Sequence, residues 1–543
     1  MSAAEEFAAL SRDVVDDLLA MDPVSATSLG DHRFDARLAD LSAAGVDAAL
    51  HRIDDHVTRL DAIDDVELDV EDLVDLEILR SRLLRVQFDL AELRPQTWNP
   101  MVWNPGTTLH LILARDFAID DERRDSLVGR LRAIPEFLSS ARSQLEDMPG
   151  IHVETAIGQL AGAATLIDGQ ARVFARDDAA ADAAHAAVVA FSDWLADRLP
   201  VSHRDPRLGE RLYSAALWHS LDDDITAEQL LFDAELHLDL IQAQLRDAAS
   251  WYLRKSRADD AMVRKALGLV AKRSPVTDQT VLGIVASALE QQTAFVREHD
   301  LVTVPELDVR VVEMPEIHRG VAVAYCDAPG PLESAAVATY VAVAPTPQTW
   351  DAERVASFYR EYNGVQLQSL TVHEAMPGHV LQLGHSRRYE SPTRVRQAFS
   401  SGAFAEGWAV YAEALMAERG YDAGSGEQQA LAVRLQQLKM QLRMTINAIL
   451  DVRVHTRGMT EDEGMRLMQV RGHQEEGEAV GKWRRALLTS CQLSTYYVGY
   501  IAVNDIVLDL RAGTPGWTDR ALHDAVLAHG SPPPRHLRTL LGI

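Results

Sequence analysis

The sequence has few cysteines, fewer basic than acidic residues, and no long apolar run. Two cysteines in 543 residues, Cys326 and Cys491, are too few for a disulfide framework and are typical of a reducing compartment. No apolar stretch approaches the roughly 20 residues that a membrane-spanning helix needs. Residues 1–20 alternate apolar and acidic residues and lack the basic segment and apolar core of a signal peptide. We therefore expect a cytoplasmic protein with no membrane span.

The charge balance argues against two classes of partner. Acidic residues outnumber basic ones by 81 to 53, which gives a formal net charge of −28. A field of that sign repels nucleic acid and anionic membrane surfaces, so we expect neither as a partner. Solubility is the simplest explanation of the acidity itself. The oligomeric state does not follow from the composition.

Several catalytic signatures are also missing from the sequence. The chain has no G-x-S-x-G nucleophile turn, no G-x-x-x-x-G-K-[ST] phosphate-binding loop and no catalytic cysteine signature. These absences argue against serine hydrolases of that type, phosphate-loop enzymes and thiol enzymes.

Hydrophobic periodicity predicts a mainly α protein. Apolar residues recur at three- and four-residue steps in many segments, among them 5–19, 48–60, 70–93, 226–253 and 428–457. The exception lies between about 308 and 344, where residues 309–312, 321–325 and 338–343 are β-rich runs separated by proline and glycine turns. We expect these runs to form a small antiparallel sheet, just before the motif described below.

The length of the chain favours more than one compact unit, because 543 residues exceed the usual size of a single one. We expect a helical lobe over residues 1–300 and a catalytic lobe over residues 301–543, made of the small sheet and further helices. No low-complexity linker marks this boundary, which leaves one intertwined domain as an alternative.

The most informative stretch is His-Glu-Ala-Met-Pro-Gly-His at residues 373–379. It places Glu374 beside one of two closely spaced imidazoles. Hydrolytic zinc sites use this combination, in which neutral imidazoles hold the metal and a carboxylate takes a proton from water. In the familiar H-E-x-x-H helix the histidines lie four residues apart on one face. Here His373 and His379 lie six apart, which on a regular helix leaves them about 120° out of phase.

Pro377 and Gly378 offer a way to bring the two histidines together. Proline has no N–H, and its ring would clash with the carbonyl of His373 in a regular helix. Glycine tolerates backbone conformations that other residues avoid. We therefore predict that the helix is bulged by two residues at this pair, so that His379 returns to the face of His373. The motif indicates an expanded zinc-hydrolase helix.

A hydrolytic zinc site needs a third protein ligand and one open position. Residues 404–413, Phe-Ala-Glu-Gly-Trp-Ala-Val-Tyr-Ala-Glu, place Glu406 and Glu413 seven apart on one face of a predicted helix. Two acids on an apolar face need a cation or hydrogen-bond partners to be buried. We expect Glu406 to bind the metal and Glu413 to orient a neighbour; the alternative is a solvated acidic stripe. His385, six residues beyond His379, has no adjacent carboxylate, and we expect it to be structural or to lie at the surface.

Two further pairs are weaker candidates. His455 lies four residues after Asp451, so either the acid fixes the imidazole tautomer or the two form an ordinary helix-surface contact. Tyr496 and Tyr500 lie one helical turn apart, and Gly499 allows a close approach. An imidazole or a tyrosine hydroxyl near the metal can stabilise a tetrahedral oxyanion. Most tyrosines at this spacing, however, simply belong to the core.

These residues together resemble a known family. His-Glu-Ala-Met-Pro-Gly-His-Val-Leu-Gln, followed by Glu-Gly-Trp-Ala-Val-Tyr-Ala-Glu from Glu406, is similar to the bacterial "domain of unknown function 885" family, regarded as related to the gluzincin metallopeptidases. The resemblance covers nearly the whole chain, because further blocks of the sequence look like its terminal signatures, namely residues 22–30, 35–40, 451–455 and 492–499. The chain departs from the family where Ser490-Cys491 stands for the usual Pro-Gly, and where Ala486 follows Arg485 in place of the usual tyrosine.

The resemblance implies a large, two-lobed, helical fold of the metallopeptidase kind. By position, the expected metal ligands are His373, His379 and Glu406, and the expected general base is Glu374. His455 and Tyr496 match positions that face the cleft. Zinc, one ion per chain, suits such a ligand set best, although manganese, cobalt or iron fits the same ligands.

We therefore expect a zinc-dependent metallopeptidase that hydrolyses short or unfolded peptides. Glu374 would take a proton from the attacking water and return it to the leaving amine, while His455 or Tyr496 would hold the oxyanion. Two alternatives stay open. One is a metal-dependent amidase or carboxypeptidase acting on a non-peptide or modified amide. The other is a non-catalytic helical scaffold, in which the six-residue spacing never closes on a metal.

Overall fold

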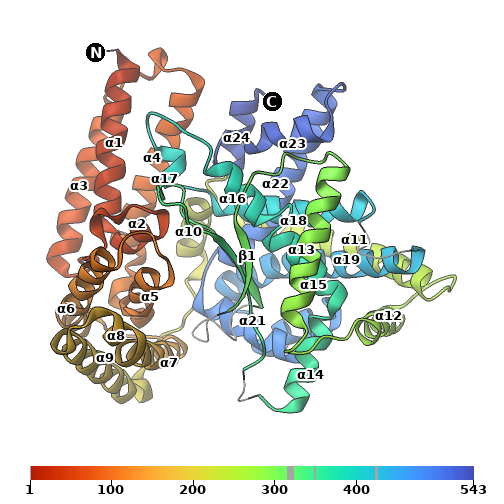
Figure 1. Ribbon diagram of the computed structural model, residues 1–543, viewed down its shortest axis with the longest axis horizontal. Coiled ribbons are helices and arrows are strands. Elements are labelled where there is room, and N and C mark those ends of the chain that lie inside the picture. Colours follow the sequence, from red (N-terminus) through yellow and green to blue (C-terminus); the bar gives the residue numbers. More distant parts are fainter. Residues whose placement is uncertain (1, 315–322, 348–349, 422–425) are drawn as a thin grey trace. The chain divides into compact units, whose positions relative to one another are not determined.

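The computed structural model describes residues 2–314, 323–347, 350–421 and 426–543. Helices dominate the described chain and one small sheet accompanies them, so the predicted mainly α fold is confirmed (Figure 1). Three of the periodic segments are long helices in the structure, namely α1 (Ala3–Met21), α11 (Ala227–Tyr252) and α19 (Glu427–Arg457).

The chain divides into two compact units, and neither of them is a continuous stretch. Unit 1 consists of Met1–Pro206, Pro329–Val337 and Glu390–Phe399. Unit 2 consists of the rest, namely Arg207–Ala328, Ala338–Tyr389 and Ser400–Ile543. The first division therefore lies near residue 206 rather than near 300. Its cause is that the helices between these two points pack inside unit 2, above all α11 against α19, through amphipathic faces.

Unit 1 is helical. Its core forms where α6, α7 and α9 pack against one another around leucine, isoleucine, valine and alanine side chains. Small side chains of α9, such as Ala181 and Ala184, are fully buried there and let the neighbouring helices come close. The helices of unit 1 besides α1 are α2 (Pro23–Leu29), α3 (Ala43–Asp61), α4 (Val70–Phe88), α5 (Gly106–Ala114), α6 (Asp120–Gln144), α7 (Gly150–Leu166), α8 (Arg172–Ala175), α9 (Asp178–Arg198) and α17 (Val395–Ala398).

The segment at residues 329–337 joins unit 1 from far along the chain. Glu333 Oε2 lies 2.9 Å from His32 Nε2, and the N–H of Leu332 donates to the carbonyl of Leu29 at 2.8 Å. Gly330 is required here, because a Cβ at this position would lie 2.1 Å from the carbonyl carbon of Leu29. The loop between the second and third strands is thus anchored on unit 1.

The segment at residues 390–399 is fastened to α4 through a buried acid. Asp75 is 1% exposed and accepts hydrogen bonds from Arg396 Nε at 2.6 Å, from Ser391 Oγ at 3.2 Å and from Thr393 Oγ1. Arg396 is also 1% exposed. A buried charge is tolerated when it is paired and hydrogen-bonded in this way, so this cluster fixes the segment to unit 1.

Unit 2 is built around α19, which contacts α11, α15, α18 and α22. More than half of the residues of α19 are buried, which explains why its apolar side chains are not confined to one stripe. The other helices of unit 2 are α10 (Gly209–Leu221), α12 (Asp260–Arg273), α13 (Val281–Glu298), α14 (Ala352–Glu361), α15 (Gly364–Glu374), α16 (His379–Ser386), α18 (Gly402–Glu418), α20 (Glu461–Arg466), α21 (Glu476–Leu488), α22 (Gln492–Gly513), α23 (Asp519–Leu527) and α24 (Pro534–Leu541).

Helices α18 and α22 approach each other closely at two glycines. A Cβ on Gly407 would lie 2.3 Å from the backbone of Gly499, and a Cβ on Gly499 would lie 2.0 Å from the carbonyl oxygen of Ala403. Any larger residue at either position would push the helices apart. Because Gly407 follows Glu406 directly, this contact places the first turns of α22 beside the turn of α18 that carries Glu406.

The small sheet has the order β1-β3-β2, with β1 at Val309–Glu313, β2 at Ala324–Asp327 and β3 at Thr339–Val343. β2 pairs antiparallel with β3, but β1 pairs parallel with it. The prediction of an antiparallel sheet is therefore wrong for one of the two pairs. The reason is that β1 pairs with β3 and not with β2, the strand that follows it in the chain. The chain therefore crosses over between β1 and β3, and the two strands run in the same direction. Residues 321 and 322 of the predicted middle strand lie outside the described residues.

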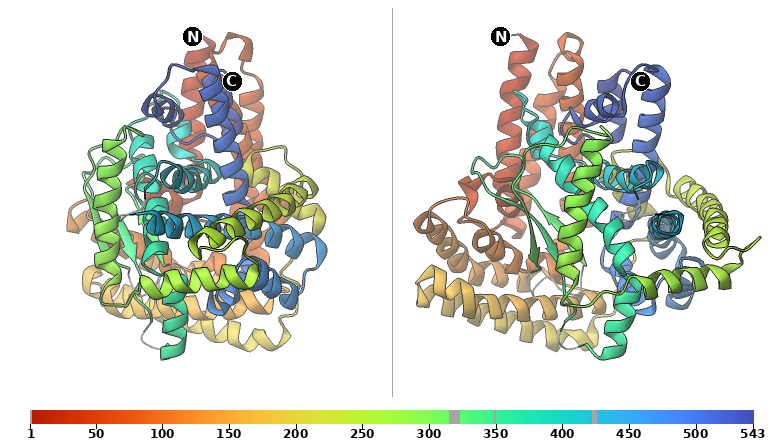
Figure 2. Two further views of the ribbon diagram at one scale, coloured as in Figure 1. Left: turned by 90° about the vertical axis from the view of Figure 1, so that its right-hand side faces the viewer. Right: turned by 45° about the vertical axis from the view of Figure 1, so that its right-hand side comes forward.

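The surroundings of the sheet belong to unit 2. α13 packs against β1 and β3, and α15 packs against β2. Figure 2 shows the light-green helix α13 beside the strands. β2 lies at one end of the sheet, so one of its edges is not paired with another of the three strands. α15 therefore lies next to the strand at that end of the sheet, which is β2.

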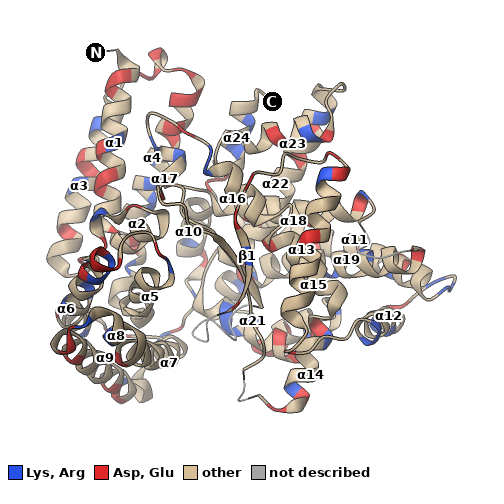
Figure 3. Ribbon diagram, viewed as in Figure 1, with Lys and Arg blue, Asp and Glu red and all other residues tan. Residues whose placement is uncertain are grey.

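The strong negative charge is distributed over many helices. Acidic residues occur along most helices of both units, with basic residues among them (Figure 3). Among the helices of the described chain, none is both long enough and apolar enough to cross a membrane.

Candidate metal centre

The two histidines of the expanded motif lie at the facing ends of two helices. α15 ends at Glu374 and α16 begins at His379, with a cis Met376–Pro377 peptide bond between them. Across this junction Gly378 N–H donates to the carbonyl of Val372 at 2.9 Å, and Leu381 N–H donates to that of Ala375 at 3.2 Å. Both hydrogen bonds reach back six residues rather than four. The predicted two-residue expansion is therefore present, but as a break between two helices rather than a bulge within one.

The junction is fixed by close packing. A Cβ on Gly378 would lie 1.9 Å from the carbonyl oxygen of His373, so only glycine fits there. The indole N–H of Trp408, on α18, donates to the carbonyl of Pro377 at 2.8 Å. The helix that carries Glu406 thus also holds the turn that positions both histidines.

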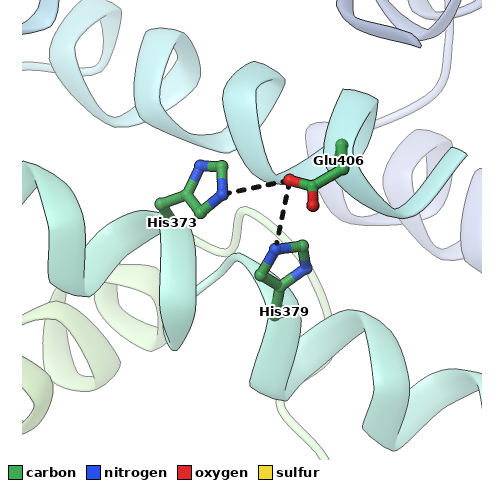
Figure 4. Close-up of side chains that lie close together, drawn as sticks. All are labelled: His373, His379 and Glu406. Carbon is green, nitrogen blue, oxygen red and sulfur yellow. Dashed lines mark ion pairs between the residues drawn. The ribbon is translucent and has the colours of Figure 1, made fainter. Parts of the chain in front are cut away.

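His373, His379 and Glu406 converge on one point (Figure 4). Glu406 Oε2 lies 3.3 Å from His373 Nε2 and 3.5 Å from His379 Nε2. Ligands held tetrahedrally about 2.0–2.1 Å from a zinc ion are separated from one another by about 3.3 Å. The two distances from Glu406 therefore match the edges of such a coordination shell, and all three ligand atoms lie within 4.8 Å of one another.

Glu406 Oε2 is buried and has no hydrogen-bond partner among the described residues. Buried carboxylate oxygens are rarely left without a donor, because the loss of hydration is costly. Two imidazole nitrogens face this oxygen at distances longer than a good charge-assisted hydrogen bond. The donor set and the orphaned oxygen together fit a divalent cation.

The electrostatics of the cluster point the same way. Burial opposes the charged form of His373, yet its contacts with Glu406 and Glu413 outweigh burial and raise the pKa of His373 well above its usual value. Burial would raise the pKa of Glu406, but the contacts with His373 and His379 outweigh it and lower that pKa. Without a metal, the cluster thus favours an ionised Glu406 beside a protonated His373, which indicates a place for positive charge.

Glu413 supports His373 from behind. Its Oε1 lies 2.8 Å from His373 Nδ1, and its side chain is buried. An ionised carboxylate can only accept, so Nδ1–H donates to it, and Nε2 is the nitrogen that faces Glu406 and is available to a metal. This is the orienting contact that the seven-residue spacing from Glu406 predicts, and it excludes a solvated acidic stripe.

Glu374 lies next to these residues and touches the sheet. The N–H of Cys326, on β2, donates to Glu374 Oε2 at 3.1 Å. Burial raises the pKa of Glu374, with Glu406 adding to the rise and the two imidazoles opposing it. The proposed base is therefore held against the edge of the sheet.

Tyr496 lies beside the cluster, and Tyr500 does not contribute to it. The Tyr496 ring stacks on that of His373 with 6.5 Å between centroids. Its hydroxyl accepts hydrogen bonds from Arg485 Nη2 and from Gln492 Nε2, each at 3.4 Å. The hydroxyl of Tyr500 instead accepts from the Gln441 amide at 3.1 Å in the core.

His455 has other partners. Its Nδ1 accepts from the N–H of Leu208 at 3.3 Å, and its Nε2 donates to the carbonyl of Thr489 at 2.9 Å and to that of Ala486 at 3.1 Å. Its ring also stacks on Tyr213. With both nitrogens bonded to main chain, His455 has no proton or lone pair to offer to an oxyanion. The sequence alone gives no sign of these partners, since they come from α10, α21 and the loop residues next to these two helices.

Asp451 caps a helix, a role that its spacing from His455 does not reveal. It is fully buried and accepts from the N–H groups of Cys491 and Ser494, each at 3.1 Å, at the start of α22. Cys491 stands at this helix start with φ +65°, in the left-handed region that favours the glycine usual in the family. His385, for its part, donates to the carbonyl of Thr303, in line with a structural role.

The family follows from comparison with known proteins. The model of the family described as "Bacterial protein of unknown function (DUF885)" matches residues 23–541. The chain therefore belongs to this family. No functionally curated protein matches it.

Two solved structures share the fold over the whole chain. A candidate lipoprotein of unknown function from Shewanella oneidensis is 28% identical, with a TM-score of 0.82, and the match covers 99% of this chain and 100% of that one. A candidate lipoprotein from Colwellia psychrerythraea has a TM-score of 0.80 at 16% identity, with 100% and 99% covered. At the second identity the likeness concerns the fold alone.

Proposed function

We propose that this member of the family is a metal-dependent hydrolase that cleaves peptide bonds. The observation that carries the proposal is the orphaned Glu406 Oε2, faced by two imidazole nitrogens at the spacing of a metal's coordination shell. The resemblance of the His373–His379 motif to gluzincin metallopeptidases supports the same conclusion.

The residues that would hold the metal are His373, His379 and Glu406. Two imidazoles and a carboxylate suit zinc best, at one ion per chain, although manganese, cobalt or iron fits the same ligands. When bound, such an ion supplies a Lewis acid that polarises the scissile carbonyl and activates a water molecule. Glu413 keeps His373 in the tautomer that offers Nε2 as a ligand.

The chain's own residues would carry the proton. Glu374 takes one proton from water as the water oxygen bonds to the carbonyl carbon, and gives it to the nitrogen as the C–N bond breaks. The Tyr496 hydroxyl, whose ring stacks on that of His373, would donate a hydrogen bond to the oxyanion that forms between these steps. His455 is left out of this scheme, because main-chain groups occupy both of its nitrogens.

An extended peptide is favoured over a compact amide by the position of β2. The N–H of Cys326 points away from β3 and donates to Glu374, so the edge of β2 that faces away from β3 runs directly past the proposed base. A strand edge can hold an extended chain by main-chain hydrogen bonds. A peptide also agrees better than nucleic acid or a membrane with the net charge of −28.

Metal content is the first test. Protein purified without a metal-affinity tag, and loaded with zinc before removal of the excess, should contain about one zinc per chain by plasma mass spectrometry. His379→Ala should lose it, since His379 supplies a ligand. His385→Ala is the matched control on the same helix and should keep it. A native protein that holds no metal after loading would contradict the proposal and favour the scaffold alternative.

The substrate is tested with the metal-loaded protein. A library of short peptides is compared with acyl-amino acids and other non-peptide amides, and products are identified by mass spectrometry. Cleavage of peptides is expected; cleavage of the non-peptide amides alone would replace the peptidase by an amidase.

A cytoplasmic location is part of the proposal. Cys326 and Cys491 are not joined to each other in a disulfide, as a reducing compartment allows. The two structural neighbours are candidate lipoproteins, and a lipoprotein would be attached at the cell envelope. Fractionation of cells that produce the protein decides between the two; recovery in the envelope fraction would contradict our proposal.

A further inference from the structure

Arg485 is a cation whose hydrogen-bond partners are neutral. It lies near the end of α21, and its Nη2 donates to Gln492 Oε1 at 2.6 Å and to the Tyr496 hydroxyl at 3.4 Å. Among the described residues, none provides a carboxylate in an ion pair with Arg485. By contrast, Lys482, one turn earlier, lies 3.8 Å from Glu478. Both members of the Gln492–Tyr496 pair, and Arg485 itself, are partly exposed.

The position of Arg485 is tied to the metal centre through Tyr496. The Tyr496 ring stacks on His373, and its hydroxyl contacts the guanidinium. The path from the His373 ring to Arg485 is therefore no longer than about four residues of extended peptide. The start of α22, which carries both neutral partners, is fixed by the Asp451 cap and by the close approach at Gly407.

A guanidinium in such a place is well suited to a carboxylate. Its planar N–H groups match the two oxygens of a carboxylate, and a charge-assisted pair is stronger than a bond to an amide or a phenol. The chain as a whole carries a net charge of −28 and repels anions. An anionic group of a substrate therefore needs a local cation if it is to approach the metal centre.

We propose that Arg485, assisted by Gln492, receives the terminal α-carboxylate of the peptide substrate. This inference rests on the proposed peptidase function and sharpens it, because it makes the protein a carboxy-terminal exopeptidase. The number of residues released follows from how far the carboxylate lies from the scissile bond, up to the limit of about four residues set by the contacts above.

Equilibrium binding tests this inference apart from turnover. Glu374→Gln protein, loaded with zinc, is titrated by calorimetry with N-acetylated alanine tripeptide as the free acid and as the carboxy-terminal amide. The two ligands differ only in the carboxylate, so the acid should bind roughly tenfold to a hundredfold more tightly. Adding Arg485→Gln should abolish this preference by weakening the acid alone, and Arg485→Lys should keep part of it.

The matched control is Arg434→Gln. Arg434 likewise donates to two glutamine side chains, at Gln437 and Gln244, but on α19 and α11. It should leave the acid preference unchanged. Equal binding of acid and amide, binding of neither, or an acid preference that survives Arg485→Gln would overturn the inference. An acid preference that depends on Arg485, together with no hydrolysis by the metal-loaded parent protein, would instead overturn the peptidase and leave the carboxylate site standing.

Discussion

Asp75 in unit 1 and Glu406 in unit 2 each bring a carboxylate oxygen into the interior, but their surroundings differ. Asp75 accepts from an arginine and two hydroxyl groups. Glu406 Oε2 has no hydrogen-bond donor among the described residues, only two imidazole nitrogens at 3.3 and 3.5 Å. The first carboxylate is fully satisfied within the fold and fastens a segment. The second has no hydrogen-bond donor within the fold, and this is the state expected of an oxygen that binds a ligand from outside the chain.

The largest effect on activity should come from replacing Glu374, the proposed general base beside the metal centre. Glu374→Gln should lower kcat/KM for peptide hydrolysis by about a thousandfold, because a general base contributes on the order of a hundredfold to ten-thousandfold. Its zinc content should stay unchanged, because Glu374 is not among the ligands. Kinetics and plasma mass spectrometry on the same samples check both. Turnover close to that of the parent would exclude Glu374 as the base.

The comparison itself is tested by two amide replacements of the same kind. Asp75→Asn should lower the free energy of unfolding by about 3 kcal/mol, since it leaves the buried Arg396 without its main charge partner. Glu406→Gln should lower the metal-free stability by less, about 1 kcal/mol, because it removes the attraction to the two imidazoles but no hydrogen-bond donor is lost from Oε2. Urea-induced unfolding of metal-free protein measures both. Equal losses of stability would show that the contacts of Glu406 stabilise the fold as much as those of Asp75 do.

The support behind the cluster should have a smaller effect. Glu413→Gln should weaken zinc binding roughly tenfold, because a neutral amide holds the His373 Nδ1–H less strongly than a carboxylate does. Competition with a chromophoric chelator gives the dissociation constant. An unchanged constant would mean that packing alone orients His373.

The smallest effect concerns His32 in unit 1, which is clamped by Asp35 and Glu333 and stacked on Phe117. Burial works to lower the pKa of His32, but the two acids outweigh it and raise that pKa. The interaction of protonated His32 with the two acids therefore stabilises the fold fully below about pH 6.5, the usual pKa of histidine. This stabilisation is lost as the pH rises through the raised pKa of His32. His32→Gln should cost about 1 kcal/mol more at pH 6 than at pH 9.

Thermal or urea unfolding at several pH values measures this difference. The loss of stacking on Phe117 is the same at each pH, so it does not change the comparison. A cost of His32→Gln that does not vary with pH would show that the two acids make no use of the charge on His32.

Local signals explain what could be predicted from the sequence. The long helices follow from apolar residues at helical spacing, and the convergence of His373 and His379 follows from the Pro-Gly pair between them. Glu413 could be placed behind the metal site because it shares a helix face with Glu406. In each case the deciding residues lie within about two helical turns of one another.

Contacts between distant segments explain what could not be predicted. The parallel pairing of β1 depends on a crossover, which periodicity does not record. The partners of His455 are main-chain groups of other elements. The same holds for the division of the chain into two units. α11 belongs to unit 2 because it packs on α19, which is distant in sequence.

The alternation of segments between the units has a consequence for any attempt to divide the gene. The coding sequence passes from unit 2 back to unit 1 twice, at residues 329–337 and 390–399. A fragment that ends at residue 206 would keep His32 and Asp75 but lack Glu333 and Arg396, and so would carry buried acids and a histidine without their counterparts. Neither unit is encoded by one continuous stretch of DNA. An exchange of either unit between related genes therefore has to replace three stretches at once.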